Sequence, residues 1–366
     1  MIRLRTGKVR DVREPRPGIL ELTVEVEGSA EPALAYPALT GPVSAGDRVL
    51  LNTTAVAYGL GSGGYHLVVA VEGQEDLDPP EAGHVMKLRY TPVQAKVRTV
   101  EEQGAPERGA IEGAEGLDGL PVVWAPLHSM VGAACAGARA AGAERIAYVM
   151  TDGAALPLWL SEQVHELRKG GLVDATITAG QAVGGDLEAV NAFTGLLAAS
   201  AVIGADAVVI ADGPGKVGTA TRWGATEVAG GMNLNTTGIL GGRAIAALRV
   251  SFADPSYRHH GVSPHSIAVL RDVALLPVHV AVPALDDERR GAVWEALKEA
   301  SLEERHQLVE VSGRPAVDLL LERGVTAATM GRDLEEDPAF FLGAGAAGIL
   351  AGRMATGDAR WRNEQG

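Results

Sequence analysis

The sequence predicts a small, barrel-like all-β domain followed by a larger α/β domain with a mostly parallel, doubly wound, Rossmann-like sheet. Residues 1–100 contain short runs in which apolar and polar residues alternate, which is typical of strands. Residues 120–366 contain almost wholly apolar runs separated by longer helical segments, which is typical of a parallel sheet covered on both faces. Between them, residues 101–119 carry six acids and five glycines without apolar periodicity, so we expect a linker or mobile flap there.

In the first domain the alternation is clearest in Leu20, Leu22, Val24 and Val26. Further strands are expected around residues 46–51 and 65–71, the second of them after a glycine-rich stretch at 59–64. Several short strands bounded by glycine and proline predict a small barrel or sandwich.

The second domain has eight apolar runs that are candidate strands. They are residues 122–125, 145–150, 174–178, 207–211, 246–250, 278–282, 308–311 and 325–329. Helical segments lie between most of them, including 156–169, 187–203 and 288–300. Eight strands also fit a (β/α)8 barrel, which periodicity does not distinguish from an open sheet. The open sheet is favoured because the connection after the fourth run is long and irregular. Both folds place ligands at the carboxyl ends of the strands.

Composition excludes several classes of protein. The chain has 366 residues, of which 46% are hydrophobic and 21% charged, as in soluble globular proteins. A net charge of −14 argues against binding to nucleic acid or to anionic membranes. The one cysteine, Cys135, predicts a buried, inert thiol and a reducing, cytoplasmic location. Residues 1–18 lack the apolar run of a signal peptide, and the uncharged stretches 119–138 and 189–205 are expected in the core rather than in a membrane.

The strongest motif follows the fourth candidate strand, immediately after Asp212. It combines three glycines, two cations and two hydroxyls: Gly213, Gly215, Lys216, Gly218, Thr219, Thr221 and Arg222. Glycines allow a ligand to approach the backbone, and the cations and hydroxyls suit a phosphate or a carboxylate. The loop is neither a Walker A motif nor a dinucleotide-binding GxGxxG motif. An ordinary flexible crossover is the alternative interpretation.

Other polar residues follow the first three candidate strands, where a ligand would bind. His128 follows the first strand, Asp152 the second and Gln181 the third. We expect His128 to contact the ligand, and Asp152 or Asp212 to orient a catalytic histidine or a divalent ion. For Asp152, which precedes a glycine, an ordinary turn is the alternative.

Three histidines, His259, His260 and His265, fall within seven residues after the fifth strand. Ser263 and Pro264 predict a helix start, which places His265 in the first turn, where the helix dipole favours neutral imidazole. Because His259 and His260 are adjacent, only one of them is expected to join His265. General acid–base catalysis or anion contact, a metal site built on His259 and His265, and structural capping of a polar loop all remain open.

Two further features have structural interpretations. His66 and His84 are expected to be solvated loop histidines. Residues 338–352 form an apolar helix in which Ala344, Gly348 and Gly352 are four residues apart. That spacing permits close backbone approach, either against the sheet or at a subunit interface that would make the protein a homo-oligomer.

Four segments carry a resemblance to a known family: GLGSGGYH from residue 59, HVMKLRYTP from 84, ADGPGKVGTATRWG from 211 and RVSFADPSYRHHGVSPHS from 249. With them the chain resembles an uncharacterised bacterial family, found mainly in Gram-positive lineages and catalogued as a domain of unknown function. The resemblance covers nearly the whole chain and includes Met330-Gly331-Arg332. It implies no activity, cofactor or catalytic residue.

Three functions are therefore open. The first is an enzyme acting on a small phosphorylated or carboxylated substrate, such as a nucleotide, at the carboxyl ends of the strands. The second is a noncatalytic ligand-binding sensor or scaffold, and the third is a divalent-metal-dependent hydrolase. The expected partner is a small anionic molecule, and the sequence names no cofactor.

Overall fold

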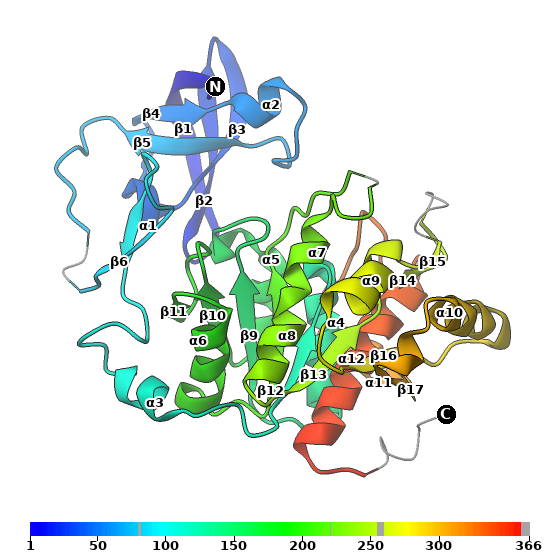
Figure 1. The fold of residues 1–366 in the computed structure, drawn as a ribbon. Helices are drawn as coiled ribbons and strands as arrows, with labels where there is room; N and C mark the ends of the chain where they lie inside the picture. Colours follow the sequence, from blue (N-terminus) through cyan, green and yellow to red (C-terminus); the bar gives the residue numbers. More distant parts are fainter. Residues whose placement is uncertain (80–81, 220, 255–259, 360–366) are drawn as a thin grey trace. The chain divides into compact units, whose positions relative to one another are not determined.

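The computed structural model describes residues 1–79, 82–219, 221–254 and 260–359. The chain divides into two compact units, Met1–Val97 and Arg98–Gly366 (Figure 1). Residues 101–119 belong to the second unit and contain the helix α3 (Arg108–Gly113), whose Ile111 is buried. Nearby, the amide of Leu117 donates a hydrogen bond to the carbonyl of Leu240 at 2.7 Å.

The first unit contains a closed five-stranded barrel in the order β1-β2-β3-β5-β4. Its elements are β1 (Leu4–Arg16), β2 (Ile19–Val26), β3 (Ser29–Ala35), α1 (Pro37–Thr40), β4 (Arg48–Asn52), α2 (Thr54–Ala57) and β5 (His66–Val71), followed by the hairpin β6 (Val85–Lys87) and β7 (Ala95–Val97). β3 and β5 are parallel and the other barrel pairs antiparallel. This order, with a short helix between β3 and β4, is that of an OB-fold barrel. The barrel prediction is confirmed.

The alternating pattern of β2 explains why this segment forms a barrel wall. Leu20, Leu22, Val24 and Val26 are buried in the barrel core, whereas Thr23 is exposed. On the outer face, arginines of β1 pair with glutamates of β2, as in the ion pairs Arg10–Glu25 and Arg13–Glu21. The basic residues near the N-terminus are thereby balanced by neighbouring acids.

The second unit contains an open eight-stranded sheet in the order β11-β10-β9-β12-β8-β13-β16-β17. Every neighbouring pair is parallel. The strands are β8 (Pro121–Trp124), β9 (Ile146–Thr151), β10 (Ala175–Ala179), β11 (Leu187–Ala189), β12 (Ala207–Asp212), β13 (Arg243–Ala247), β16 (His279–Pro283) and β17 (Gln307–Val311). The doubly wound sheet is confirmed, and the alternative of a closed (β/α)8 barrel is wrong because β11 and β17 stand at opposite ends of the sheet and do not pair with each other.

One candidate strand was placed wrongly. Residues 325–329 contribute only Thr329, which forms an isolated bridge with Arg332. The eighth strand is instead β11, which lies where the sequence predicted the beginning of a helix. It forms there because Ile177–Ala179 of β10 offers a free edge to Leu187–Ala189.

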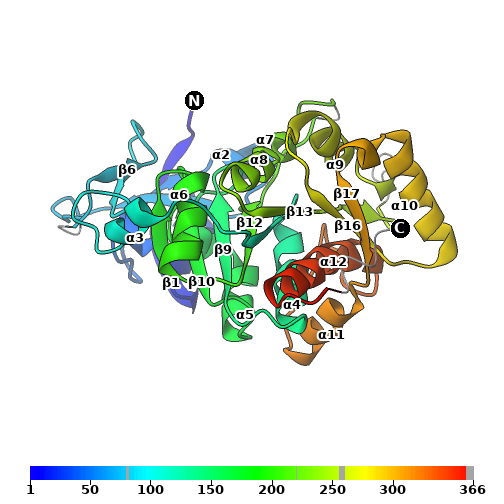
Figure 2. The ribbon, with the colours of Figure 1, turned by 60° about the horizontal axis from the view of Figure 1, so that its bottom comes forward.

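Helices cover both faces of the sheet (Figure 2). One hydrophobic core includes residues of α4 (Val131–Ala140), α5 (Glu162–Lys169), α11 (Arg314–Glu322) and α12 (Pro338–Ala355). The other includes residues of α3, α6 (Ala192–Leu197), α8 (Met232–Ile239) and α10 (Asp287–Glu299). The short elements α7 (Thr226–Gly230), β14 (Val250–Ser251), β15 (Gly261–Val262) and α9 (Pro264–Ala268) belong to the connections that follow β12 and β13. Cys135 is buried on α4 as predicted, and burial raises the pKa of its thiol.

The glycines of α12 allow it to pack tightly against α4. A Cβ on Gly348 would lie 1.9 Å from the carbonyl oxygen of Ala134, and one on Gly352 would lie 2.5 Å from that of Ala138. The apolar helix therefore packs inside the unit, which is one of the two roles expected for it. By length and composition α12 could span a membrane, but 78% of it is buried in the core.

Candidate functional site

The sheet topology creates two places where a ligand crevice is expected. Successive connections leave the carboxyl ends of neighbouring strands in opposite directions between β9 and β12, and again between β8 and β13. At such switch points of a doubly wound sheet the loops separate, and ligands bind in the space between them. The strands β8 and β12 lie side by side between these two points.

A pocket of ≈ 660 Å³ lies at the carboxyl ends of β8 and β12. Four segments line it: Leu127–Ser129 after β8, Gly213–Lys216 after β12, the first turns of α5 with Glu162, Gln163 and Glu166, and Thr326 with Ala328–Met330. Four residues predicted to bind the ligand are thus brought together, namely His128, Gly213, Gly215 and Lys216. The volume is that of a small-molecule site.

Among the residues that the structure describes, Lys216 is the only lysine or arginine that lines this pocket. Its side chain is only 8% exposed, and its Nζ lies 2.8 Å from Oδ2 of Asp212. Asp212 Oδ1 accepts hydrogen bonds from Thr151 Oγ1 at 2.6 Å and from the amide of Gly153 at 3.1 Å. Within the described residues neither Nζ nor Oδ2 makes a well-aligned hydrogen bond beyond this ion pair. Both atoms are themselves buried, so the ammonium group acts on the pocket through its charge rather than through exposed donors.

The glycines of the loop after β12 bring Lys216 back to Asp212. A Cβ on Gly213 would lie 2.3 Å from the carbonyl oxygen of Ala155, so only glycine fits there. Gly215 has φ +87, a left-handed conformation that glycine adopts without strain. The amide of Ala155 donates to the carbonyl of Pro214 at 2.9 Å, which fixes the turn against the segment after β9.

His128 forms a buried polar network on another wall of the pocket. Its Nε2 lies 2.7 Å from Ser161 Oγ, and its Nδ1 lies 3.1 Å from the hydroxyl of Tyr148 and 3.3 Å from the carbonyl oxygen of Asp212. Ser161 also caps α5, because its Oγ accepts a hydrogen bond from the amide of Val164. The network joins the ends of β8 and β12 to the start of α5.

Burial lowers the pKa of His128 to about 4, with a further contribution from the positive charge of Lys216; the hydrogen bond to the Asp212 carbonyl acts in the opposite direction. The folded protein therefore holds His128 neutral, whereas the unfolded chain takes up a proton near pH 6.5. His128 contributes its full stabilisation above pH 6.5, and this is lost as the pH falls towards 4.

We expect this loss to be about 3 kcal/mol in the free energy of unfolding, from 1.36 kcal/mol per pKa unit. Urea titrations between pH 7 and pH 4 should show a smaller fall in stability for His128→Gln than for the wild type. His165→Gln, on the outer part of α5, is the control for loss of a histidine. Equal pH dependence of the His128→Gln variant and the wild type would contradict a buried, neutral His128.

A buried cluster of arginines and aspartates supports the rim of the pocket. Asp254 Oδ2 lies 3.6 Å from Arg249 and 3.3 Å from Arg332, and Arg332 Nε lies 3.1 Å from Asp337 Oδ2. Arg332 closes a tight turn with Thr329 through two backbone hydrogen bonds. Met330, at the tip of this turn, has φ +49 and lines the pocket. The ion pairs thus hold the rim turn in a conformation that a methionine rarely adopts.

Glu227 on α7 is a buried carboxyl that the sequence analysis missed. Burial raises its pKa, while the charges of Lys216 and Arg249 and a hydrogen bond from Ser266 act in the opposite direction. The hydroxyl of Ser266 lies 3.1 Å from Glu227 Oε1. The only signal in the sequence was its position eleven residues after Lys216 in the same connection.

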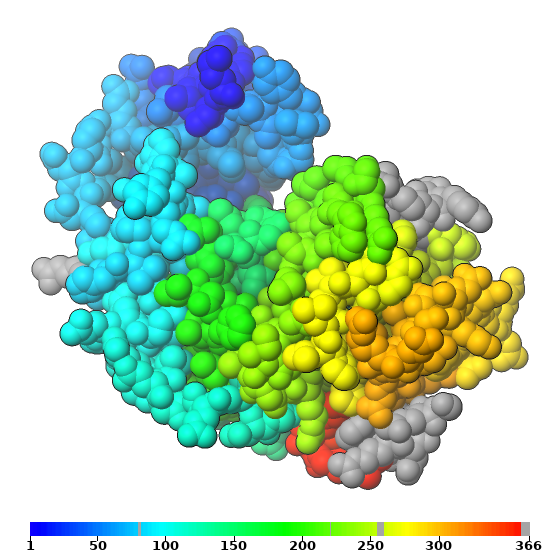
Figure 3. All heavy atoms as spheres, viewed as in Figure 1, coloured from blue at the N-terminus to red at the C-terminus, as the bar shows by residue number. Residues whose placement is uncertain are grey.

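The second half of the loop after β12 does not line the pocket. Thr219 and Thr221 are exposed and bond to each other and to Gly224. Arg222 is 51% exposed, pairs with Asp272 and lies 4.7 Å over the ring of Trp223. This segment, light green in Figure 3, projects from the surface. The structure therefore separates Thr219, Thr221 and Arg222 from Lys216.

Asp152 also lies outside the pocket. Its Oδ2 accepts a hydrogen bond from the amide of Gln181 at 2.8 Å, and the residue is exposed. A Cβ on Gly180 would lie 2.2 Å from the same oxygen. These contacts fit the alternative of a structural turn, in which Asp152 joins the loops that follow β9 and β10.

The histidine cluster is described only in part, because His259 lies outside the described residues. The predicted helix start is confirmed: α9 begins at Pro264, and Ser263 Oγ accepts from the amide of His265 at 3.3 Å. His265 is buried, and its Nε2 lies 4.0 Å from the position of a Cβ on Gly218. His260 packs edge-on against Phe252. Within the described part of the chain, no three His, Cys, Asp or Glu residues are grouped as metal ligands.

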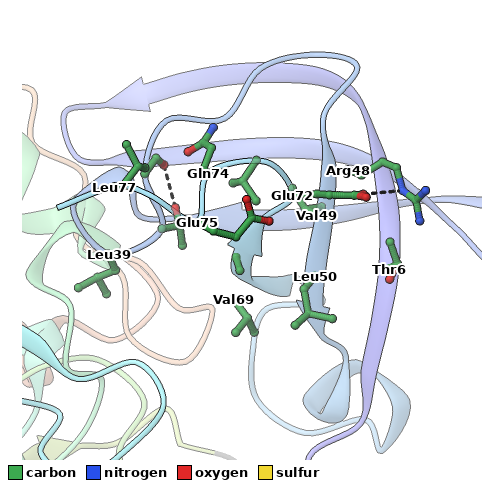
Figure 4. Close-up of a pocket in the computed structure, with 14 residues that line it drawn as sticks. Thr6, Leu39, Arg48, Val49, Leu50, Val69, Glu72, Gln74, Glu75 and Leu77 are labelled. Carbon is green, nitrogen blue, oxygen red and sulfur yellow. Dashed lines mark hydrogen bonds and ion pairs between the residues drawn. The ribbon is translucent and has the colours of Figure 1, made fainter. Parts of the chain in front are cut away.

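The barrel unit has a hollow of its own, of ≈ 530 Å³, on the side of β4 and β5 (Figure 4). Its one arginine, Arg48, pairs with Glu72 at 2.9 Å. Glu75 adds another acid, so this hollow offers no unbalanced cation to an anion. The prediction for His66 is wrong: the residue begins β5, is 3% exposed and bonds Glu31 at 2.6 Å.

Comparison with known families assigns the chain to one of them. The family described as "Protein of unknown function (DUF3866)" matches residues 32–348. The chain is a member of this family. The match spans parts of both units and includes every residue that lines the pocket between β8 and β12. It confirms the resemblance to a family of unknown function, whereas the distribution of that family among bacteria stays a prediction. No curated protein and no solved structure matches the chain.

Proposed function

We propose that the α/β unit is an enzyme that binds a small molecule through a phosphate or carboxylate group. The observation that carries the proposal is Lys216, a lysine more than nine-tenths buried that a glycine turn holds at a pocket of small-molecule size. In the described part of the chain, no other lysine or arginine lines this pocket. The charge of a buried ammonium group acts strongly on a nearby anion because little water screens it.

The buried ionisable groups around the pocket support an enzyme over a passive scaffold. Asp212, Glu227, Arg249 and Asp254 are all nine-tenths or more buried and lie close to the carboxyl ends of β12 and β13. Burying charges costs free energy even when they are paired, so a group of buried charged side chains seldom stabilises a fold. Burial raises the pKa of Glu227, and buried carboxyls of this kind gather at catalytic sites.

Binding of inorganic phosphate, phosphomonoesters and small carboxylates tests the proposal. We expect calorimetry to show binding to the wild type, and a loss of at least about tenfold in affinity for Lys216→Met, since contacts to charged groups contribute about 1.5–3 kcal/mol. Arg222→Ala is the matched control, because it also removes one positive charge of the same loop but lies outside the pocket.

Circular dichroism should show that each variant is folded. If Lys216→Met unfolds, the variant Asp212→Asn/Lys216→Met removes both charges and keeps an acceptor for Thr151. Equal loss of binding in Arg222→Ala and Lys216→Met, or no binding to the wild type, would overturn the proposal. A ligand retained in stoichiometric amount without product would favour the sensor over the enzyme.

A further inference from the structure

A serine and a histidine face each other beside the pocket between β8 and β12. Ser161 Oγ lies 2.7 Å from Nε2 of His128. The histidine lines the pocket, and so do Glu162 and Gln163, the two residues that follow Ser161 at the start of α5. Ser161 itself is 5% exposed, so its hydroxyl lies next to the pocket with little water around it.

The surroundings of His128 set the direction of this hydrogen bond. The carbonyl oxygen of Asp212, 3.3 Å from Nδ1, only accepts, and burial lowers the pKa of His128 to about 4, which keeps the ring neutral at pH 7. The hydroxyl of Tyr148, also near Nδ1, has carbonyl oxygens at 3.4 Å to which it donates. The ring proton therefore belongs on Nδ1. Nε2 carries the free electron pair and accepts from the Ser161 hydroxyl.

The hydroxyl of Ser161, the imidazole of His128 and the carbonyl of Asp212 thus form one chain of hydrogen bonds. A hydroxyl bonded to an imidazole base, which a third group orients, is the arrangement that activates a serine nucleophile. Here the third group is a backbone carbonyl rather than a carboxylate. It fixes the tautomer and the orientation of the ring, which are what the base requires.

The start of α5 offers donors to negative charge beside Ser161. The amide of Val164 donates to Ser161 Oγ at 3.1 Å. The amides of Glu162 and Gln163, in the same first turn, have no acceptor among the residues that the structure describes. They are two backbone donors for an oxyanion that forms next to the serine, in the manner of an oxyanion hole.

We propose that Ser161 is the nucleophile of an ester hydrolysis and that His128 is its general base. The inference rests on the proposed function and gives that enzyme its reaction, with a small ester that carries a phosphate or carboxylate group as substrate. Ser161 Oγ bonds to the carbonyl carbon of the ester, and its proton passes to His128 Nε2. The ester C–O bond then breaks, and the alcohol leaves with that proton. Water, deprotonated by His128, cleaves the acyl-serine, which releases the acid and restores the hydroxyl.

Methanesulfonyl fluoride, a compact reagent for activated serines, tests the nucleophile. Mass spectrometry of peptides from the labelled wild-type protein should locate the adduct on Ser161. His128→Gln should slow the labelling by about 100-fold or more, since a general base contributes at least about that much. The rate of hydrolysis of 4-nitrophenyl acetate should fall in parallel.

Ser161→Ala should abolish both the adduct and the hydrolysis. The matched control is Ser263→Ala, because Ser263 is likewise a buried serine that caps a helix, α9. This control should react as the wild type does. Ser161→Gly perturbs an N-cap less than alanine does, so it provides the same test if Ser161→Ala fails to fold.

Three results would overturn the nucleophile: no adduct on the wild type, an adduct at another residue only, or an equal loss of labelling in Ser263→Ala and Ser161→Ala. Calorimetry with phosphate and carboxylates then still decides the proposed function by itself. If Ser161 is labelled but no anion binds, the serine mechanism stands and the anionic substrate class fails.

Discussion

Replacing Asp212 by asparagine is expected to lower the free energy of unfolding of the α/β unit by about 3–5 kcal/mol. The change keeps an oxygen that accepts from Thr151 and Gly153 but leaves the ammonium group of Lys216 buried without its counter-charge. Tryptophan fluorescence during urea titration is a selective measurement, because all five tryptophans lie beyond residue 98 and the barrel unit contains none.

Two further variants give this prediction its controls. Asp212→Asn/Lys216→Met should be more stable than Asp212→Asn alone, because the second change removes the unpaired charge. Arg222→Ala breaks an exposed ion pair with Asp272 and should cost about 1 kcal/mol or less. If the double variant is as unstable as the sum of its single changes, the two residues are not coupled and the pairing at the pocket is refuted.

Replacing Gly348 by alanine is expected to destabilise the same unit by about 3 kcal/mol or more, at the upper end of the cost of overpacking. The added Cβ would lie 1.9 Å from the carbonyl oxygen of Ala134 and 2.9 Å from the amide nitrogen of Ala138. Both are backbone atoms of α4, so the clash is relieved only if one helix moves. The measurement is again the urea midpoint followed by tryptophan fluorescence.

Gly291 is the matched control for Gly348. It lies inside α10, and a Cβ there meets no atom within 4 Å. Gly291→Ala should therefore stabilise the protein by about 0.5–1 kcal/mol, because alanine is the better helix former. A Gly348→Ala variant as stable as Gly291→Ala would show that α12 and α4 are not in backbone contact.

Much of the fold could be predicted because burial follows simple periods in the sequence. Alternation in β2 and continuous apolar runs in β9 and β12 reflect one buried face and two buried faces respectively. The prediction failed where pairing, rather than burial, decides the structure. Residues 325–329 alternate between buried and exposed but find no neighbouring strand, whereas Leu187–Ala189 forms a strand because β10 offers its edge.

The candidate site was predicted in part for a similar reason. The glycine loop identified Lys216, because Gly213 and Gly215 act locally to turn the chain. The environment of Arg222 depends on Asp272, fifty residues further along, and that of His128 depends on Ser161. No spacing in the sequence shows such distant partners. The pocket-lining residues Glu162 and Glu166 of α5 and the carboxyl of Glu227 were missed for the same reason.

The close packing of α12 against α4 also bears on the order of events during synthesis. The strand β8 and the helix α4 leave the ribosome some two hundred residues before α12, which contacts them both. Until then the apolar face of α4 lacks its main covering. The α/β unit therefore completes its core only when its last helix has been made, so its folding is governed by contacts between the two ends of the unit rather than by growth from its beginning.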